Sequence, residues 1–300
     1  MNQLNELQSS MDEVMKDGSL KTQKLVKFLE KKLEKTLKRL DRIINQSDRQ
    51  QLSLINLNNT ITFQSEKLDK LHKYDIQQQI IAREKLDSAI VDDLKNSTLF
   101  SSKTIYKPAD ILSGDFYSTH TLKDGSVFVY IIDGQGHGIS PALTVFAVSS
   151  TISHLVDEDI SFEKIIEKLF PIIQKFLGEI EQLSFTMIGL SSNKKNISYV
   201  SGGMYPFIIK TGEKILKYKP NNLPFMNFSP TPKIDSIIID NWDDIIIYTD
   251  GLVEDLTEDM EEFSPLNILS SSSVFNTVKK KLESGKFEDD ITVVQITNIK

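Results

Sequence analysis

Cysteine is absent from this sequence of 300 residues, and histidine occurs only four times. Without thiols the chain can form neither disulfides nor the thiolate sites that hold most structural zinc. His72, His120, His137 and His154 are scattered along the chain and show none of the paired spacings of zinc ligands. These absences argue against zinc as a cofactor.

Long apolar runs are missing as well. The N-terminal residues MNQLNELQSS are polar and do not resemble a signal peptide. No window approaches the roughly 18 apolar residues that a membrane span requires. The sequence therefore predicts a cytoplasmic protein without a membrane span.

Positive charge is in short supply in the C-terminal part. Residues 1–100 carry 17 Lys+Arg and 15 Asp+Glu, a net charge of +2, whereas residues 101–300 carry 18 and 27, a net charge of −9. Because a nucleic-acid backbone requires a basic surface, we expect no nucleic-acid binding. An acidic region of this kind is better suited to bind cations.

Glycine and proline are nearly absent from residues 1–75, where Gly18 is the one exception, and aromatic residues are few. This composition cannot form a compact core, but it carries a heptad pattern. Counting Val26 as position a, ten of fourteen a and d positions are apolar over seven heptads, which is typical of a coiled coil. The a positions are Val26, Leu33, Leu40, Ser47, Leu54, Ile61 and Leu68, and the d positions are Leu29, Thr36, Ile43, Gln50, Leu57, Gln64 and Leu71.

The heptads predict that residues 1–75 form a helical coiled-coil region and that the protein is a homodimer through its N-terminal helices. Two amphipathic helices folded back as an antiparallel hairpin are the alternative, and Ser47 and Gln50 mark a weak midpoint of the seam. The phase breaks after Tyr74, so we expect a separate helix over about 76–95 within a linking, regulatory segment at 76–97. Because no flexible linker follows it, such a helix can transmit a shift to the next domain.

From residue 98 the sequence changes to short apolar, β-branched runs separated by turns. Ser140 and Pro141 predict the N-cap and first residue of one helix, and a second helix is expected over about 161–178. Many strands with few helices predict an α+β domain over residues 98–300, with largely antiparallel sheets. The expected strands are 126–133, 185–190, 197–200, 206–210, 214–218, 234–239, 245–249 and 291–296.

Aspartates recur beside these strands. They are Asp115 in SGDFY, Asp133 in IIDG, Asp250 in IIIYTDG, and Asp289 with Asp290 in DDITVV. A buried carboxylate is costly unless a cation neutralises it, and Mg²⁺ and Mn²⁺ prefer such oxygen ligands. Any single Asp-Gly pair is more typical of a hairpin turn, which we expect for Asp124 and Gly125. The recurrence at four places favours a metal site.

Six segments together resemble the SpoIIE-like, sporulation-type branch of the PP2C/PPM phosphatases over about residues 98–300. They are SGDFYS, IIDGQGHGISPAL, SFTMIGL, ISYVSGGMYPFII, IIIYTDGLVED and DDITVV. The resemblance implies a protein serine/threonine phosphatase with a PP2C-like β-sandwich of antiparallel sheets flanked by helices. It also implies two Mn²⁺ or Mg²⁺ ions. The ligands implied are Asp133, which would bridge both ions, the carbonyl of Gly134, and Asp115, Asp250 and Asp289, with Asp290 as the alternative to Asp289.

The predicted chemistry follows from this ligand set. Two divalent ions roughly 3.5–4 Å apart lower the pKa of a water between them and stabilise an in-line displacement at phosphorus. Asp133 is therefore the predicted catalytic residue, and no serine nucleophile is needed. His137, which lies between two glycines, is expected to orient its loop rather than to act as a general acid.

Two departures from the family pattern affect the prediction. Met204 stands where the family usually has a histidine, so we interpret residues 202–206 as a structural turn. Residues 98–300 contain no arginine, the residue that eukaryotic relatives use to clamp phosphate. Phosphate must then be held by the metal ions, backbone N–H groups or a lysine, and contacts between proteins must supply affinity.

The resemblance implies a phosphorylated STAS-type protein, an anti-sigma-factor antagonist, as the substrate, and regulation through the N-terminal helices. The alternative is a catalytically inactive PP2C-like fold that acts as a dimeric interaction scaffold. The presence of all the predicted aspartate ligands favours the enzyme.

Overall fold

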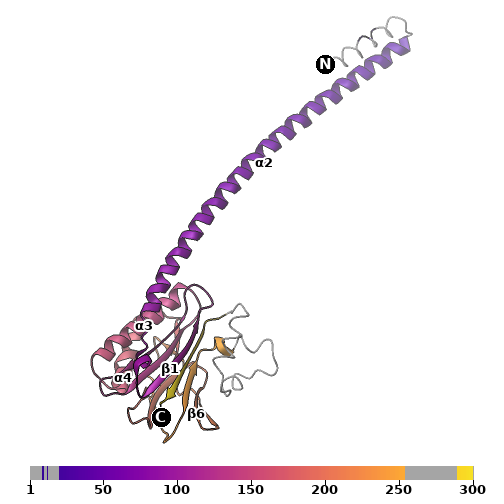
Figure 1. Ribbon diagram of the computed structural model, residues 1–300. Coiled ribbons are helices and arrows are strands. Elements are labelled where there is room, and N and C mark those ends of the chain that lie inside the picture. The colour runs from indigo at the N-terminus through magenta and orange to yellow at the C-terminus, as the bar shows by residue number, and fades with distance from the viewer. Residues whose placement is uncertain (1–8, 10–11, 13–19, 254–288, 300) are drawn as a thin grey trace. The chain divides into compact units, whose positions relative to one another are not determined.

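The computed structural model describes residues 9, 12, 20–253 and 289–299 (Figure 1). By the pattern of its contacts the chain divides into two units, Met1–Tyr74 and Asp75–Lys300. The second unit contains all of the β-strands. It therefore contains the predicted site.

Helix α2 runs without interruption from Leu20 to Ser88. The separate helix predicted after Tyr74 is therefore wrong, and so is the antiparallel hairpin, because α2 contains no reversal. The sequence offers the reason: neither glycine nor proline occurs between residues 20 and 88, so nothing stops the helix. The change in heptad phase alters which face of α2 is apolar, and it does not end the helix.

Residues 89–97 pack against the sheets instead of continuing the predicted helix. They contain a short 3₁₀ helix, η1, at Asp93–Asn96, and Leu94 is fully buried. The Val91 N–H donates to Ser118 Oγ over 3.0 Å, and Thr119 Oγ1 donates to Asp92 Oδ1 over 2.9 Å. This segment is therefore part of the folded domain.

In the part of the domain that the structure describes, the strands form two antiparallel sheets. The first has five strands in the order β1-β11-β10-β6-β7, and the second has six, β2-β3-β4-β5-β9 with β8 paired to β4. Their bounds are β1 Phe100–Lys107, β2 Asp115–Thr121, β3 Val127–Gly134, β4 Gln182–Leu190, β5 Asn196–Gly202, β6 Phe207–Thr211, β7 Lys214–Tyr218, β8 Phe225–Met226, β9 Asp235–Ile238, β10 Asp244–Tyr248 and β11 Ile291–Asn298.

Strand β3 shows how the layers are built. Val127, Val129 and Ile131 belong to a core that they share with apolar residues of the five-stranded sheet. Phe128 and Tyr130 point to the other face and pack in a second core with the helices. This alternation follows from the two-residue period of a strand. The sheets therefore stack face to face, as the predicted sandwich requires.

Helices α3 (Ile139–Asp157) and α4 (Phe162–Ile173) cover the outer face of the six-stranded sheet (Figure 1). Ser161 caps α4 by accepting from the Lys164 N–H. Helix α3, however, begins one residue before the predicted N-cap, Ser140, and is capped by Gly138. The backbone of Gly138 has a φ of 93°, which favours glycine at that position.

Among the described residues, α3 is long and apolar enough to cross a membrane by length and composition alone. This finding differs from the expectation, drawn from the sequence, that no segment is apolar enough to span a membrane. Val145, Val148, Ile152 and Leu155 of α3 are nevertheless buried in the core against the six-stranded sheet. We therefore interpret α3 as a core helix of the domain.

Candidate metal centre

Strands β2 and β3 bring Asp115 and Asp133 opposite each other. Asp115 is the first residue of β2 and Asp133 is the last but one of β3, and the two are register partners in the antiparallel pair. Asp115 is buried and Asp133 is half-buried. The structure thus places two of the predicted ligands at one end of the six-stranded sheet.

Strands β10 and β11 form a similar arrangement in the other sheet. Asp250 follows the end of β10, and Asp289 precedes the start of β11, which is antiparallel to β10. Gly251 lets the two backbones approach, since a Cβ at this position would lie 2.2 Å from the Asp290 carbonyl oxygen. Only glycine fits such a close approach.

The ends of the two sheets are joined through Asp115. Its Oδ2 accepts hydrogen bonds from Thr249 Oγ1 at 2.8 Å and from Thr292 Oγ1 at 2.6 Å. Thr249 directly precedes Asp250, and Thr292 is the second residue of β11, which follows Asp289 and Asp290. The side chain of Asp115 is therefore anchored next to both of the other aspartate segments.

The electrostatics of this region favour a cation. Burial raises the pKa of Asp115 well above its usual value, and the neighbouring Asp133 carboxylate raises it further. The two threonine hydroxyls oppose this shift in pKa because they stabilise the charged form. A divalent cation beside the carboxylates would offset both unfavourable effects.

Asp290 has a different environment from Asp289. The Asp290 carboxylate accepts from the Ala109 N–H at 2.7 Å and from the Gly114 N–H at 2.6 Å, one on each oxygen. Asp290 is buried, whereas Asp289 is half-buried and accepts from the Asp290 N–H at 2.8 Å. Asp290 thus holds the loop before β2 in place.

Gly114 has no side chain, and this allows its backbone to lie close to the carbonyl groups of Gly134 and Gly136. A Cβ on Gly114 would lie 2.8 Å from the Gly136 carbonyl oxygen and 3.0 Å from that of Gly134. Carbonyl and carboxylate oxygens are the donors that Mg²⁺ and Mn²⁺ prefer, so the residues present fit such ions. Within the described residues, however, no three His, Asp or Glu side chains stand close enough together to hold an ion as they are.

Residues 123–298 match the family model described as Stage II sporulation protein E (SpoIIE). This match covers more than half of the chain. The chain belongs to the SpoIIE family. No curated protein sequence matches it.

Solved PP2C domains share the fold of this SpoIIE-family chain. The SiaA-PP2C domain of Pseudomonas aeruginosa has a TM-score of 0.62 at 15% identity, over 75% of this chain and 98% of that one. The PP2C phosphatase domain and a regulatory fragment of SpoIIE from Bacillus subtilis give 0.55 at 20% identity, over 67% and 64%. The catalytic domain of the serine/threonine phosphatase PstP, in complex with two manganese ions, gives 0.53 at 12% identity, over 67% and 99%.

These likenesses show the fold. The predicted SpoIIE-like family and the PP2C-like sandwich fold are confirmed.

Three other residues singled out in the sequence of this SpoIIE-family domain lie in loops, turns or the core. His137 is exposed, on a loop between Gly136 and Gly138, whose φ values are 88° and 93°. Met204 is buried between the sheets, after Gly203 with its φ of 73°. The hairpin turn predicted at Asp124 is present, since Asp124 Oδ1 accepts from the Ser126 N–H.

The roles of Thr249, Thr292 and Gly114 were not expected from the sequence. A signal for the threonines was available, because each hydroxyl adjoins an apolar run within three residues of a predicted ligand. Gly114 had no comparable signal, since its role depends on which carbonyls fold against it.

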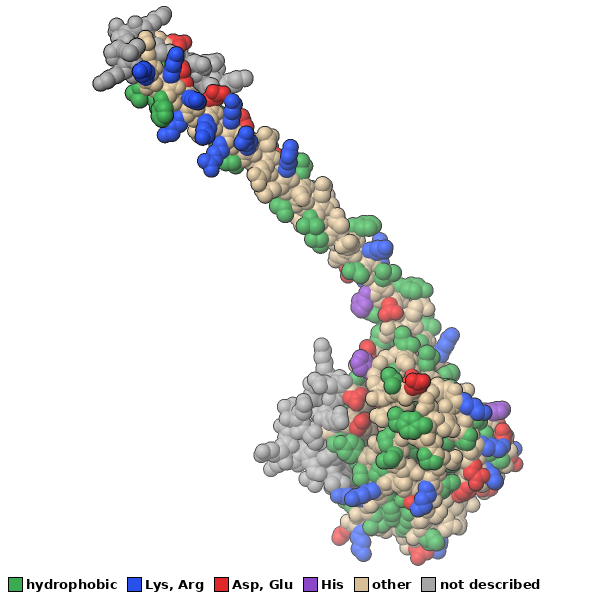
Figure 2. All heavy atoms as spheres, turned by 180° about the vertical axis from the view of Figure 1, so that it is seen from behind, with side chains coloured by type: hydrophobic (Ala, Val, Ile, Leu, Met, Phe, Trp, Pro, Cys, Tyr) green, Lys and Arg blue, Asp and Glu red, His purple; other side chains and the backbone are tan. Residues whose placement is uncertain are grey.

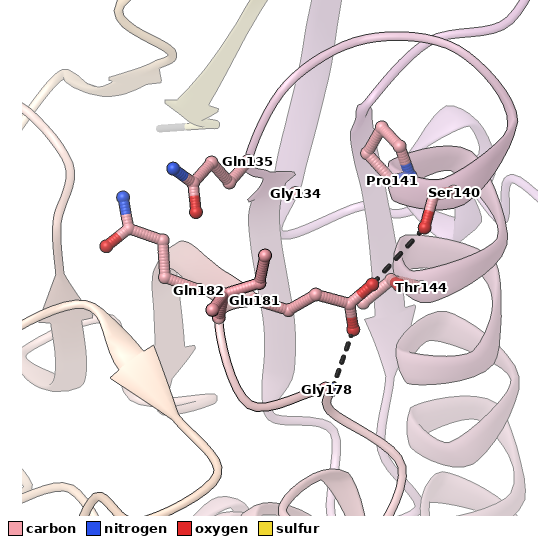
Figure 3. A pocket seen from close by; sticks show the side chains of 9 residues that line it. Gly134, Gln135, Ser140, Pro141, Thr144, Gly178, Glu181 and Gln182 are labelled. Atoms are coloured by element: carbon pink, nitrogen blue, oxygen red, sulfur yellow. Dashed lines mark hydrogen bonds between the residues drawn. The ribbon is translucent and has the colours of Figure 1, made fainter.

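A pocket of about 580 Å³ lies beside Gly134 (Figure 3). The N-terminal turns of α3 form one wall, and the segment from Gly178 to Gln182 forms another. Its lining residues are Gly134, Gln135, Ser140, Pro141, Thr144, Gly178, Ile180, Glu181 and Gln182.

Proposed function

We propose that this SpoIIE-family chain is a metal-dependent protein phosphatase that hydrolyses phosphoserine or phosphothreonine on a partner protein. The observation that carries the proposal is the anchoring of Asp115, opposite Asp133, by hydroxyls that flank the Asp250 and Asp289 segments. This anchoring connects the Asp115–Asp133 pair of one sheet with the Asp250 and Asp289 segments of the other, which supports the proposal.

The proposed ligands for two Mn²⁺ or Mg²⁺ ions are Asp115, Asp133, Asp250 and Asp289 and the carbonyl of Gly134. When bound, the ions would supply an activated water and neutralise charge on the phosphoryl group. Among the protein groups, Thr249 and Thr292 orient Asp115, and Asp290 holds Gly114 in place beside the Gly134 carbonyl. The hydrogen bonds of Asp290 to two backbone N–H groups support Asp289 as the ligand.

The proposed substrate is a phosphorylated STAS-type anti-sigma-factor antagonist. Support comes from membership of the SpoIIE family and from the lack of arginine in residues 98–300, which leaves phosphate recognition without a bidentate clamp. A folded protein substrate can supply the missing affinity through its surface. The cytoplasmic location expected from the sequence stays a prediction.

We also propose a homodimer formed by α2 and regulation through this helix. Apart from Val26, which is buried, the predicted a and d side chains are exposed in the single chain, with Leu40 at 49% and Leu54 at 60% of their full exposure. Hydrophobic side chains recur along α2 in Figure 2. A seam of this kind requires an apolar partner surface.

The test is Mn²⁺-dependent release of phosphate from phosphorylated STAS-type proteins. We expect Asp133→Asn to abolish release without unfolding, because it removes a charge and keeps the shape of the side chain. Asp124→Asn is the matched control, since Asp124 serves a hairpin turn. Wild-type protein that binds Mn²⁺ and releases no phosphate from any such substrate would favour the inactive scaffold.

A further inference from the structure

The loop between Gly134 and α3 leads from the end of a strand to the first turn of a helix. It consists of residues 135–138, of which Gly136 and Gly138 adopt positive φ values of 88° and 93°. A Cβ added at either glycine would meet nothing within 4 Å. Gly134 itself is the last residue of β3, where it pairs with Leu183 and its N–H donates to the Gly114 carbonyl oxygen over 2.9 Å. The carbonyl of Gly134 faces the start of the loop, so its orientation also depends on the residues that hold the two ends of the loop.

Glu181 and Gln182 contact both of these ends. The Gln182 carbonyl oxygen accepts from the Gln135 N–H over 3.2 Å. The Glu181 carboxylate accepts from Ser140 Oγ over 3.2 Å and from the Gly178 N–H over 2.9 Å. Figure 3 shows the Glu181 side chain reaching from its own loop to the first turn of α3. Two consecutive residues thus hold the beginning and the end of the loop.

The first two turns of α3 also pack directly on Gly134. A Cβ added at Gly134 would lie 3.1 Å from Pro141 Cβ and 3.2 Å from Val145 Cγ1. Pro141 is covalently joined to Ser140, the residue that Glu181 holds. A shift of these turns would therefore reach the Gly134 carbonyl without any intermediate residue.

We propose that Glu181 is a positioning residue for the Gly134 carbonyl, acting through Ser140 and through the Gln182–Gln135 backbone bond. The proposal rests on the proposed function, because it takes Gly134 as a metal ligand. Hydrogen bonds to a carboxylate are stronger than those between neutral groups, so one half-buried glutamate is able to fix the turn. Groups that orient a metal ligand typically change metal affinity by 10–100-fold when they are removed.

The experiment compares the full chain with its Glu181→Ala variant by calorimetric titration with Mn²⁺. We expect the Kd for Mn²⁺ to rise roughly tenfold in the variant, with turnover largely recovered at saturating Mn²⁺. In the metal-free protein the Gln135 amide should exchange its hydrogen faster, while the melting temperature stays near that of the wild type. Glu179→Ala is the matched control, because Glu179 is an exposed glutamate in the same loop. It should leave the Kd for Mn²⁺ and the Gln135 exchange unchanged.

Two further variants test the route. Ser140→Ala should raise the Kd for Mn²⁺ by a smaller factor, and combining it with Glu181→Ala should add less than the product of the two single effects. Glu181→Gln keeps one acceptor oxygen on the side chain and nearly the same volume, so its Kd for Mn²⁺ should lie between those of the wild type and Glu181→Ala. If Glu181→Ala does not fold, Glu181→Gln tests the proposal instead. An unchanged Kd for Mn²⁺ and unchanged Gln135 exchange in Glu181→Gln and Glu181→Ala would overturn the proposal.

The failure of this inference and that of the proposed function give different results. Wild-type protein that binds Mn²⁺ but releases no phosphate overturns the phosphatase assignment alone. Wild-type protein that binds no Mn²⁺ overturns both. A variant that melts at a lower temperature with an unchanged Kd shows a purely structural role for Glu181 and overturns the positioning role.

Discussion

Asp115 is held by two hydroxyl groups that come from the opposite sheet. Thr249 Oγ1 donates to Asp115 and also accepts from the Thr292 N–H at 3.0 Å, so the two threonines are linked to each other. A buried carboxylate with neutral donors on one oxygen keeps a fixed orientation, but it is not neutralised. A fixed but unneutralised carboxylate is suited to receive a cation.

Asp289 and Asp290 should respond differently to substitution. Asp290→Ala leaves the Ala109 and Gly114 N–H groups without their acceptor, which should lower the free energy of unfolding by about 2–3 kcal/mol. Asp289→Ala should change this free energy little and should abolish tight Mn²⁺ binding. Urea unfolding of the metal-free proteins and calorimetric Mn²⁺ titration measure the two effects. The reverse pattern would make Asp290 the ligand.

His120 should make the stability of the fold sensitive to acid. Burial lowers the pKa of His120, and the charges of Asp93 and then Asp157 oppose this shift. Among the described residues its Nε2 has no hydrogen-bond partner, and its ring stacks on Tyr130. Because its pKa is lower in the folded than in the unfolded state, protonation favours unfolding. The stability is thus complete above the unfolded pKa of about 6.5 and falls as the pH drops toward the folded pKa.

We expect His120→Phe to flatten this dependence, since phenylalanine keeps the ring contact and cannot be protonated. The measurement is the melting temperature between pH 7.5 and pH 5, with the exposed His154→Phe as control. If the wild type and His120→Phe lose the same number of degrees over this range, His120 is not the group responsible.

At the level of whole elements, apolar strands were predictable and polar ones were not. Strand β3 is a continuous apolar run, and the run 126–133 differs from it by one residue at each end. Strand β2 was missed because Ser118, Thr119 and His120 are polar and nevertheless buried. Their partners lie in residues 91–92, where Val91 N–H and Asp92 bind two of them, so the pairing depends on tertiary contacts that a local pattern does not contain.

The candidate site was predictable only in part for a similar reason. The aspartates are visible because they stand next to strands and beside glycine. Their mutual arrangement depends on the register of β2 with β3 and on the stacking of the two sheets, neither of which a local pattern specifies. Glu181 lies in a loop that contacts α3 only through the tertiary structure, by its hydrogen bond with Ser140, so a local sequence pattern does not reveal the contact.

Helix α2 offers a prediction at the level of a single element. Replacing Leu40 and Leu54 together with lysine should convert a dimer into a monomer, because each charge would enter the apolar seam. The matched control is Leu52→Lys with Phe63→Lys, since these residues are at least as exposed on the single helix as Leu40 and Leu54 but lie off the a and d positions. Sedimentation at tens of micromolar (roughly assay concentration) gives the answer. Monomeric wild type, or dimeric Leu40→Lys/Leu54→Lys protein, would rule out this seam.

At the scale of the whole molecule, regulation of the proposed metal centre by α2 depends on a second pocket, in the unit that begins at Asp75. It has a volume of about 340 Å³ and is lined by residues of α2, by Leu112 and by the N-terminal part of α3. Ile139 and Leu143 of α3 are exposed here, at 53% and 61% of their full exposure. The remaining lining residues are Asp75, Gln78, Gln79, Ala82, Lys85, Leu86, Ala142 and Phe146.

This pocket connects the last turns of α2 with the proposed metal centre. The same first turns of α3 that line it also pack on Gly134 through Pro141. A helix end that moves at the pocket would bias the position of the Gly134 carbonyl, as a two-state regulatory element requires. The simpler interpretation is that the last turns of α2 only cover apolar side chains.

Two shortened forms separate these interpretations, one that begins at Asp75 and one that begins at Ala89. The second starts at Ala89 because Ala89 and Ile90 pack on the core and Leu94 is buried, so a start at residue 98 would damage the domain itself. We expect the Kd for Mn²⁺ to rise severalfold from the full chain to the form from Asp75, as dimerisation is lost. It should rise again in the form from Ala89, as one wall of the pocket is removed.

Melting temperatures of the three metal-free forms should stay close together, since the cores of the sheets are intact in all three. Equal Mn²⁺ affinity and equal turnover in the three forms would leave the end of α2 with a packing role alone, whereas a graded loss of affinity at constant melting temperature requires that α2 acts on the metal centre.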